Sequence, residues 1–126
     1  FGEMSTAARL HKLTTGDPTA MDASTVLKMA TIDGARAIGL GNRIGSLKIG
    51  KQADLIVLDT HAPHLTPMYH PASHLVYSPG GGDVRHVLVA GVPLVKDRQI
   101  LSLDVHDIMS RVTAIADTIR LRLTKE

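Results

Sequence analysis

The chain has 126 residues, of which 44% are hydrophobic and 21% charged, a balance typical of a folded globular protein. The formal net charge of +2 is small, and no Lys/Arg cluster alternates with aromatic residues, which argues against a nucleic-acid partner. The absence of cysteine excludes disulfides and thiolate metal sites and favours a cytoplasmic protein, and no apolar run approaches the roughly 20 residues that span a membrane.

Residues 1–42 are predicted to be helical. Apolar residues within 4–13 recur three or four positions apart, as in a helix with one buried face. The sequence Thr-Gly-Asp-Pro at 15–18 ends this helix. A second helix is predicted from Asp22, its expected N-cap, to the stop signal at Gly39.

Residues 43–102 have a strand pattern instead. The apolar run within 54–59 predicts a short buried strand. The stretch 60–83 is rich in Pro and Gly and is expected to be mostly loop, with a short helix at 71–77. Three further strands are predicted at 84–90, 92–96 and 99–101, the first two joined by a turn at Gly91.

Residues 103–126 are predicted to form a last helix, with Asp104 as its N-cap. Its apolar residues fall on one stripe: Val105, Ile108, Met109, Val112, Ile115, Ala116, Ile119 and Leu123. Such a stripe is more often a docking face within a protein's own fold than a site for another protein.

Histidines are the first candidates for metal ligands. The seven are His11, His61, His64, His70, His74, His86 and His106. The pairs 61/64 and 70/74 have spacings that metal ligands sometimes use, but each pair has a proline within or beside it and no third ligand converges on it. We therefore predict ordinary surface or packed histidines, and no metal, cofactor-binding or catalytic residue in this chain.

Other catalytic patterns are also missing. The glycines at 39–45 and 80–82 lack the strand-before, helix-after context of a phosphate loop and are expected to form turns. No Gly-x-Ser-x-Gly motif is present. Asp54 and Asp59 stand about 16 Å apart along an extended strand, too far for shared acid/base chemistry, so each is expected to end a strand.

Three blocks in one order carry a resemblance to a known family. Residues 44–59, IGSLKIGKQADLIVLD, resemble the Gly-Ser…Gly-x-x-Ala-Asp-Leu signature near the C-terminus of metal-dependent amidohydrolases. The helical stretch 30–40 and the hairpin 84–95 resemble the segments that flank it. Residues 1–13 and 70–77 are most similar to the aminohydrolase/deaminase subgroup, which includes 5-methylthioadenosine/S-adenosylhomocysteine deaminases and triazine chlorohydrolases. One departure is Lys-Asp-Arg-Gln at 96–99, where the family usually has a glycine.

The resemblance implies an α+β fragment of a larger enzyme. Residues 1–42 would be the last helices of a (β/α)8 barrel, 43–102 the C-terminal part of the β-sandwich, and 103–126 a closing helix that packs back on the barrel. The helical pattern already under way at Phe1 agrees with a cut end. The parent's divalent metal, Zn or Fe, would be held by residues before Phe1 and would activate water for hydrolytic deamination.

The resemblance also sets the expected partners. These are the rest of the amidohydrolase chain and a small nucleoside or heterocyclic amine substrate, with a homo-oligomer as the assembly. The last-helix stripe and a second apolar face of Leu10, Leu13, Val26 and Leu27 are expected to pack on barrel elements. The alternative is a non-catalytic structural or interaction module derived from this segment, or an enzyme with its own His-metal site.

Overall fold

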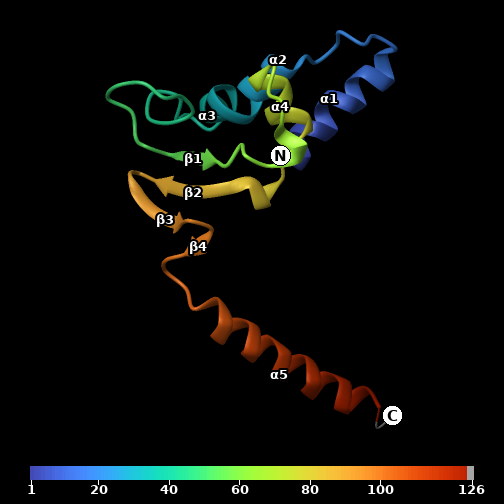
Figure 1. Cartoon of the computed structure of the whole chain (residues 1–126), viewed down its shortest axis with the longest axis vertical. Coiled ribbons are helices and arrows are strands. Elements are labelled where there is room, and N and C mark those ends of the chain that lie inside the picture. The colour runs from blue at the N-terminus through green and yellow to red at the C-terminus, as the bar shows by residue number, and fades with distance from the viewer. Residues whose placement is uncertain (125–126) are drawn as a thin grey trace.

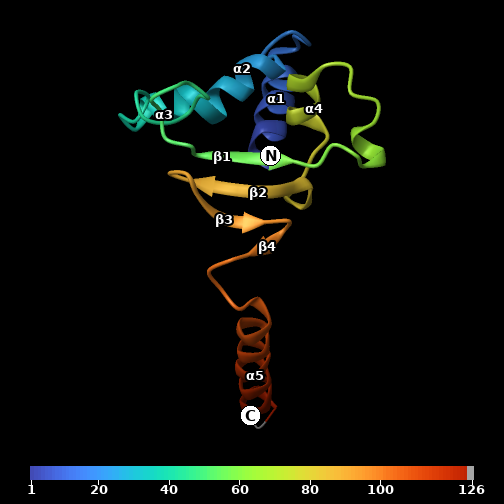
Figure 2. The same ribbon diagram turned by 60° about the vertical axis from the view of Figure 1, so that its left-hand side comes forward.

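The computed structural model describes residues 1–124 and has three parts in chain order. Helices gather at one end, a four-stranded sheet lies next to them, and one long helix extends from the far side of the sheet (Figures 1 and 2). No helix among residues 1–124 is long and apolar enough to cross a membrane.

The N-terminal part contains α1 (Gly2–Thr15), α2 (Ala23–Lys28), a π-helical turn (Met29–Asp33) and α3 (Gly34–Ala37). The predicted cap is confirmed, since the Asp22 carboxylate accepts a hydrogen bond of 2.8 Å from the Thr25 amide. The π-helical turn was not predicted. It ends at Gly34, where a Cβ would lie 2.9 Å from the Met29 carbonyl oxygen, so the missing side chain permits this close backbone approach.

A small core forms where α1 and α2 meet α4 (Pro71–Tyr77), the short helix predicted inside the loop-rich stretch. Its buried members are Ala8, Ala23, Val26 and Val76. The expectation that Val26 shares an uncovered face with Leu10 and Leu13 is wrong, because Val26 is only 2% exposed while the two leucines are 52% and 80% exposed. The reason is that α4, about fifty residues downstream, packs over α2.

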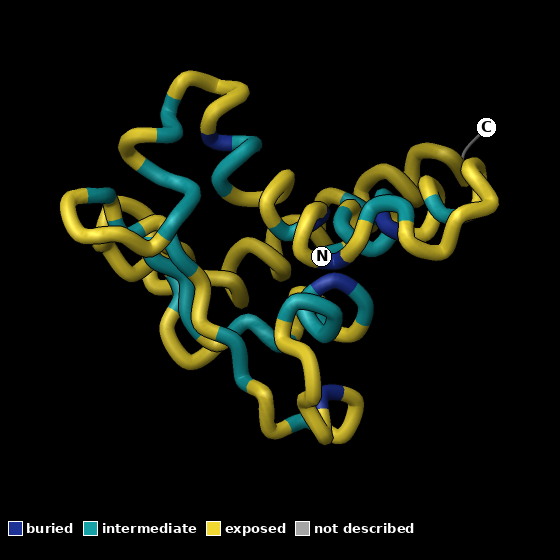
Figure 3. The backbone as a smooth tube through the Cα atoms, turned by 90° about the horizontal axis from the view of Figure 1, so that it is seen from above, coloured by how far each residue is buried: buried dark blue, intermediate teal, exposed yellow. Residues whose placement is uncertain are grey.

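The sheet is antiparallel, in the order β1 (Leu55–Leu58), β2 (Val84–Val89), β3 (Val92–Lys96) and β4 (Gln99–Ile100). The strands are those predicted, but β1 is not buried within this chain, since Ile56 is 48% and Val57 42% exposed. All four residues of β1 are apolar, so both faces of the strand are apolar. Among residues 1–124 no second layer covers either face of the sheet (Figures 2 and 3).

The turn between β3 and β4 forms without a glycine. Asp97 and Arg98 both have positive φ, 47° and 65°, the left-handed conformation of a two-residue hairpin turn. The Arg85 guanidinium donates to Asp97 at 2.8 Å, and the Arg98 Nε donates to the Gly82 carbonyl at 3.0 Å. These side-chain bonds offset the strain that glycine would avoid, so the departure from the family pattern leaves the hairpin intact.

The last helix, α5 (Val105–Leu123), begins as predicted, with the Asp104 carboxylate accepting from the Asp107 amide at 3.0 Å. It extends away from the rest of the chain (Figure 1). The large side chains of its apolar stripe are uncovered, with exposed fractions from 40% at Val105 to 69% at Leu123, and the small Ala116 is half-buried. Within residues 1–124 this stripe has no packing surface.

Candidate functional site

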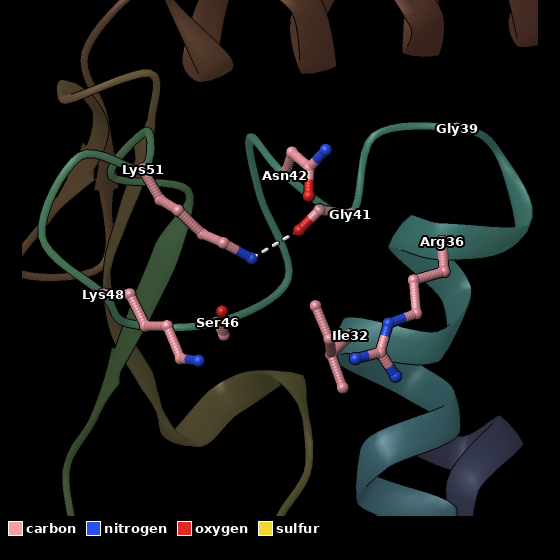
Figure 4. Close-up of a pocket in the computed structure, with 8 residues that line it drawn as sticks. All are labelled: Ile32, Arg36, Gly39, Gly41, Asn42, Ser46, Lys48 and Lys51. Carbon is pink, nitrogen blue, oxygen red and sulfur yellow. Dashed lines mark hydrogen bonds between the residues drawn. The ribbon is translucent and has the colours of Figure 1, made fainter.

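A hollow of about 570 Å³ lies between α3 and the loop that leads to β1 (Figure 4). Its lining combines one apolar side chain with glycine backbone and polar or cationic side chains. These residues are Ile32, Arg36, Gly39, Gly41, Asn42, Ser46, Lys48 and Lys51. We refer to this feature as the basic pocket.

The loop conformation depends on Gly45, which directly precedes the pocket residue Ser46. Gly45 has φ of +82°, and a Cβ there would lie 2.6 Å from the Ala35 Cβ and 2.9 Å from the Ile32 Cα. Only glycine therefore lets the loop turn back against α3 at this distance. The sequence pattern had identified Gly45 as a turn residue, but not the helix against which it packs.

The cations of the basic pocket have different surroundings. Lys51 donates to the carbonyls of Gly41 and Ile44, which fixes its ammonium at the loop (Figure 4). Arg36 forms a 2.8 Å ion pair with Asp33. Lys48 forms no ion pair with any residue of 1–124. No carboxylate lines the pocket.

Ser46 adds an unusual hydroxyl group. Its Oγ is inaccessible to solvent and has no hydrogen-bond partner among the described residues. Figure 4 places it between Lys48 and Ile32. A buried hydroxyl without a partner carries a desolvation cost, so a rotation of this side chain toward a bound acceptor would be favourable.

The 61/64 histidine pair does not converge. His64 Nε2 lies 3.1 Å from the Asp83 carboxylate, whereas His61, 95% exposed, faces Asp59 at 3.4 Å. The two rings therefore have different carboxylate partners, and neither shares a ligand position with the other.

The two histidines of the 70/74 pair also have different positions and do not form a shared metal site. His70 is the N-cap of α4, and its Nδ1 accepts from the Ser73 amide at 3.2 Å. His74 lies within the helix. Of the others, the His86 Nδ1 accepts from the Asp97 amide at 3.1 Å, while His11 and His106 lie on α1 and α5.

The strand-end role proposed for the two aspartates agrees with their contacts. Asp54 accepts a hydrogen bond from the Ala90 amide, which ties β1 to the β2–β3 turn. Asp59 accepts from the His61 amide at 3.1 Å and from Arg98 at 3.3 Å. The His61 amide and then Arg98 lower the pKa of the Asp59 carboxyl.

A metal ion finds no site in the part of the chain that the structure describes, because no three His, Asp or Glu side chains in residues 1–124 are grouped so as to hold one. We expect the purified 126-residue chain to contain no stoichiometric zinc or iron. Elemental analysis after purification without added metal measures this. One tightly held metal per chain would contradict the prediction.

Three carboxylates around the sheet should make the free energy of unfolding depend on pH in the acidic range. The Gly80 amide and then His64 lower the pKa of Asp83, and Arg85 lowers that of Asp97, as the His61 amide does for Asp59. Since each folded-state pKa lies below the ordinary 3.8, the stabilisation is complete above 3.8 and is lost as pH falls through the folded-state values.

Asp83→Asn should therefore lower the unfolding temperature at neutral pH, and its difference from wild type should shrink as the pH is lowered below 3.8. Thermal unfolding at neutral pH and at a pH below 3.8 measures this. Asp107→Asn, on exposed α5, is the control. A difference from wild type that is the same at both pH values would contradict the assignment.

The basic pocket lies in a part of the chain that is similar to known proteins. Residues 1–94 match the amidohydrolase family. A 5-methylthioadenosine/S-adenosylhomocysteine deaminase from Syntrophobacter fumaroxidans is 55% identical over 120 residues, which are 95% of this chain and 27% of that protein. A 5'-deoxyadenosine deaminase from Methanosarcina mazei is 46% identical, over 98% of this chain and 28% of that protein. The chain thus spans little more than a quarter of the length of these curated relatives.

Solved structures show the same fold. The crystal structure of an adenosine deaminase from Xanthomonas campestris with bound zinc has a TM-score of 0.88 and 41% identity, over 95% of this chain and 27% of that one. An atrazine chlorohydrolase from Arthrobacter aurescens, complexed with zinc, has a TM-score of 0.78 and 24% identity, over 90% of this chain and 25% of that one. At 24% identity the second similarity concerns the fold alone.

Proposed function

Because the chain belongs to the amidohydrolase family, we propose that it is the C-terminal part of a hydrolase that acts on carbon–nitrogen bonds other than peptide bonds. In the proposed reaction, water replaces the amino group of an adenine-type nucleoside and ammonia leaves. The observation that carries the proposal is the 55% identity to a 5-methylthioadenosine/S-adenosylhomocysteine deaminase over nearly the whole chain. The chlorohydrolase similarity is much weaker, which favours deamination over dechlorination.

The proposal assigns the chain a structural role in that enzyme. Residues 1–42 would be the last helices of the barrel, 43–102 the C-terminal part of the sandwich, and 103–126 the closing helix. Its support is the uncovered apolar surface on both faces of the sheet and along α5, which a larger fold would cover. The zinc-bound relatives support a divalent metal in the parent enzyme. Residues 1–124 would not hold this metal, because no three possible ligands are grouped there.

The remaining partners follow from the same proposal. The chain would bind the rest of its own amidohydrolase polypeptide, in a cytoplasmic homo-oligomer. The substrate, a nucleoside or related heterocyclic amine, would contact barrel residues outside this segment. We therefore assign no catalytic, metal or cofactor-binding residue within the chain.

Ammonia release by the full-length protein tests the reaction. We expect ammonia from 5-methylthioadenosine or S-adenosylhomocysteine, with loss of the nucleoside measured in parallel. Guanine and a chlorotriazine serve as comparison substrates. No ammonia from adenosine-like compounds, together with turnover of guanine or the triazine, would overturn the substrate assignment.

A non-catalytic module is the second candidate. The feature that favours it is the absence of a metal-ligand group in residues 1–124. The module candidate predicts that the 126-residue chain is a stable monomer and that no form of the protein releases ammonia, whereas the deaminase candidate predicts the opposite for both.

A further inference from the structure

The basic pocket concentrates positive charge without an acidic counterpart. Arg36, Lys48 and Lys51 line it, and no Asp or Glu does. Asp33 offsets part of this positive charge, because it forms an ion pair with Arg36. The two lysines thus leave an excess positive charge on one side of the hollow, opposite Arg36 (Figure 4).

Several hydrogen-bond donors around the basic pocket have no acceptor within residues 1–124. The Lys51 ammonium occupies the carbonyls of Gly41 and Ile44. The backbone amides of Gly41, Asn42 and Ser46 donate to no acceptor within residues 1–124, and the Ser46 hydroxyl has no partner. A ligand rich in acceptor oxygens would use donors that the chain itself leaves unused.

We propose that the basic pocket is a binding site for a small phosphate-type oxyanion. A metal ion is disfavoured by the absence of carboxylates, and an extended polyanion by the confinement of the charge to one hollow of about 570 Å³. Lys48 would supply the principal charge, because it is the one cation of the three without a described partner. Arg36 would divide its guanidinium between Asp33 and the anion. This site is independent of the deaminase proposal, since the pocket lies entirely within the described chain.

Equilibrium dialysis with radiolabelled inorganic phosphate tests the site, at about 0.15 M NaCl so that exposed charges are screened. We expect saturable binding of one phosphate per chain. Lys48→Gln should weaken it about fivefold, the effect of removing a unit charge roughly 4 Å away in a water-like dielectric. Lys48→Arg should retain binding. Lys96→Gln, on β3, makes the same charge change away from the pocket and should bind as wild type does.

The measurement uses the full-length protein, because the isolated 126-residue chain is expected to self-associate, and circular dichroism verifies that each variant is folded. Ser46→Ala should weaken phosphate binding at unchanged net charge, which separates a built site from general attraction. Absence of saturable binding would overturn the proposal. Equal loss in Lys48→Gln and Lys96→Gln would also overturn it, because it would mark non-specific attraction to net charge.

Discussion

Gly45→Ala is expected to destabilise the protein far more than alanine at another left-handed glycine. The new Cβ would lie 2.6 Å from the Ala35 Cβ and 2.9 Å from the Thr31 carbonyl oxygen. Neither neighbour is the flexible end of a side chain, so α3 and the loop would have to separate. Overpacking of this kind costs about 1–3 kcal/mol, and the left-handed conformation adds roughly 1–2 kcal/mol.

Gly50→Ala is the matched control. Gly50 has φ of +88°, but a Cβ there would meet nothing within 4 Å. This variant should lose only the conformational term, about 1–2 kcal/mol. Shifts in the thermal unfolding midpoint of the full-length protein compare the two variants. Equal shifts would show that the contact between Gly45 and α3 is not formed.

The isolated 126-residue chain is expected to self-associate. Leu13 on α1, Ile56 on the sheet and the stripe on α5 are all exposed to water. Covering several hundred Å² of such surface, at about 25 cal/mol per Å², is worth on the order of 10 kcal/mol, which is comparable to the whole stability of a domain. The open edge of β1 adds unpaired backbone groups that can pair with another chain.

Light scattering should therefore give a mass well above the 13.5 kDa of one chain. The double variant Val112→Glu/Ile119→Glu places charges on the α5 stripe and should lower that mass. Ser110→Glu/Thr118→Glu adds the same charges to the same helix away from the stripe and should have little effect. A cooperative monomer in dilute solution would contradict the expectation and favour the independent module.

Local sequence patterns predicted most of the elements correctly. The α5 stripe, the cap at Asp104 and the hairpin around Gly91 depend on residues close in sequence, and all three are found. The amidohydrolase resemblance and its deaminase subgroup are confirmed by the relatives at 46–55% identity. The description of residues 1–42 as the last helices of the barrel, 43–102 as part of the sandwich and 103–126 as a closing helix that packs on the barrel stays a proposal.

What the sequence could not predict depends on contacts across the chain. The burial of Val26 requires α4, about fifty residues away, and the exposure of β1 reflects the lack of a covering layer within residues 1–124. The basic pocket was missed because Arg36, Lys48 and Lys51 are spread over sixteen positions. The run of Gly39, Gly41 and Gly45 between Arg36 and Lys48 was the available signal, but only the fold against α3 brings the cations to one hollow.

The coding sequence upstream of Phe1 tests the central claim most directly. A barrel of about 250 residues should precede this segment, so we expect an open reading frame that continues upstream for roughly 300 residues and encodes a His-x-His motif near its beginning. A start codon immediately before Phe1, with no such motif in the same frame, would contradict the account and identify the chain as a free-standing module.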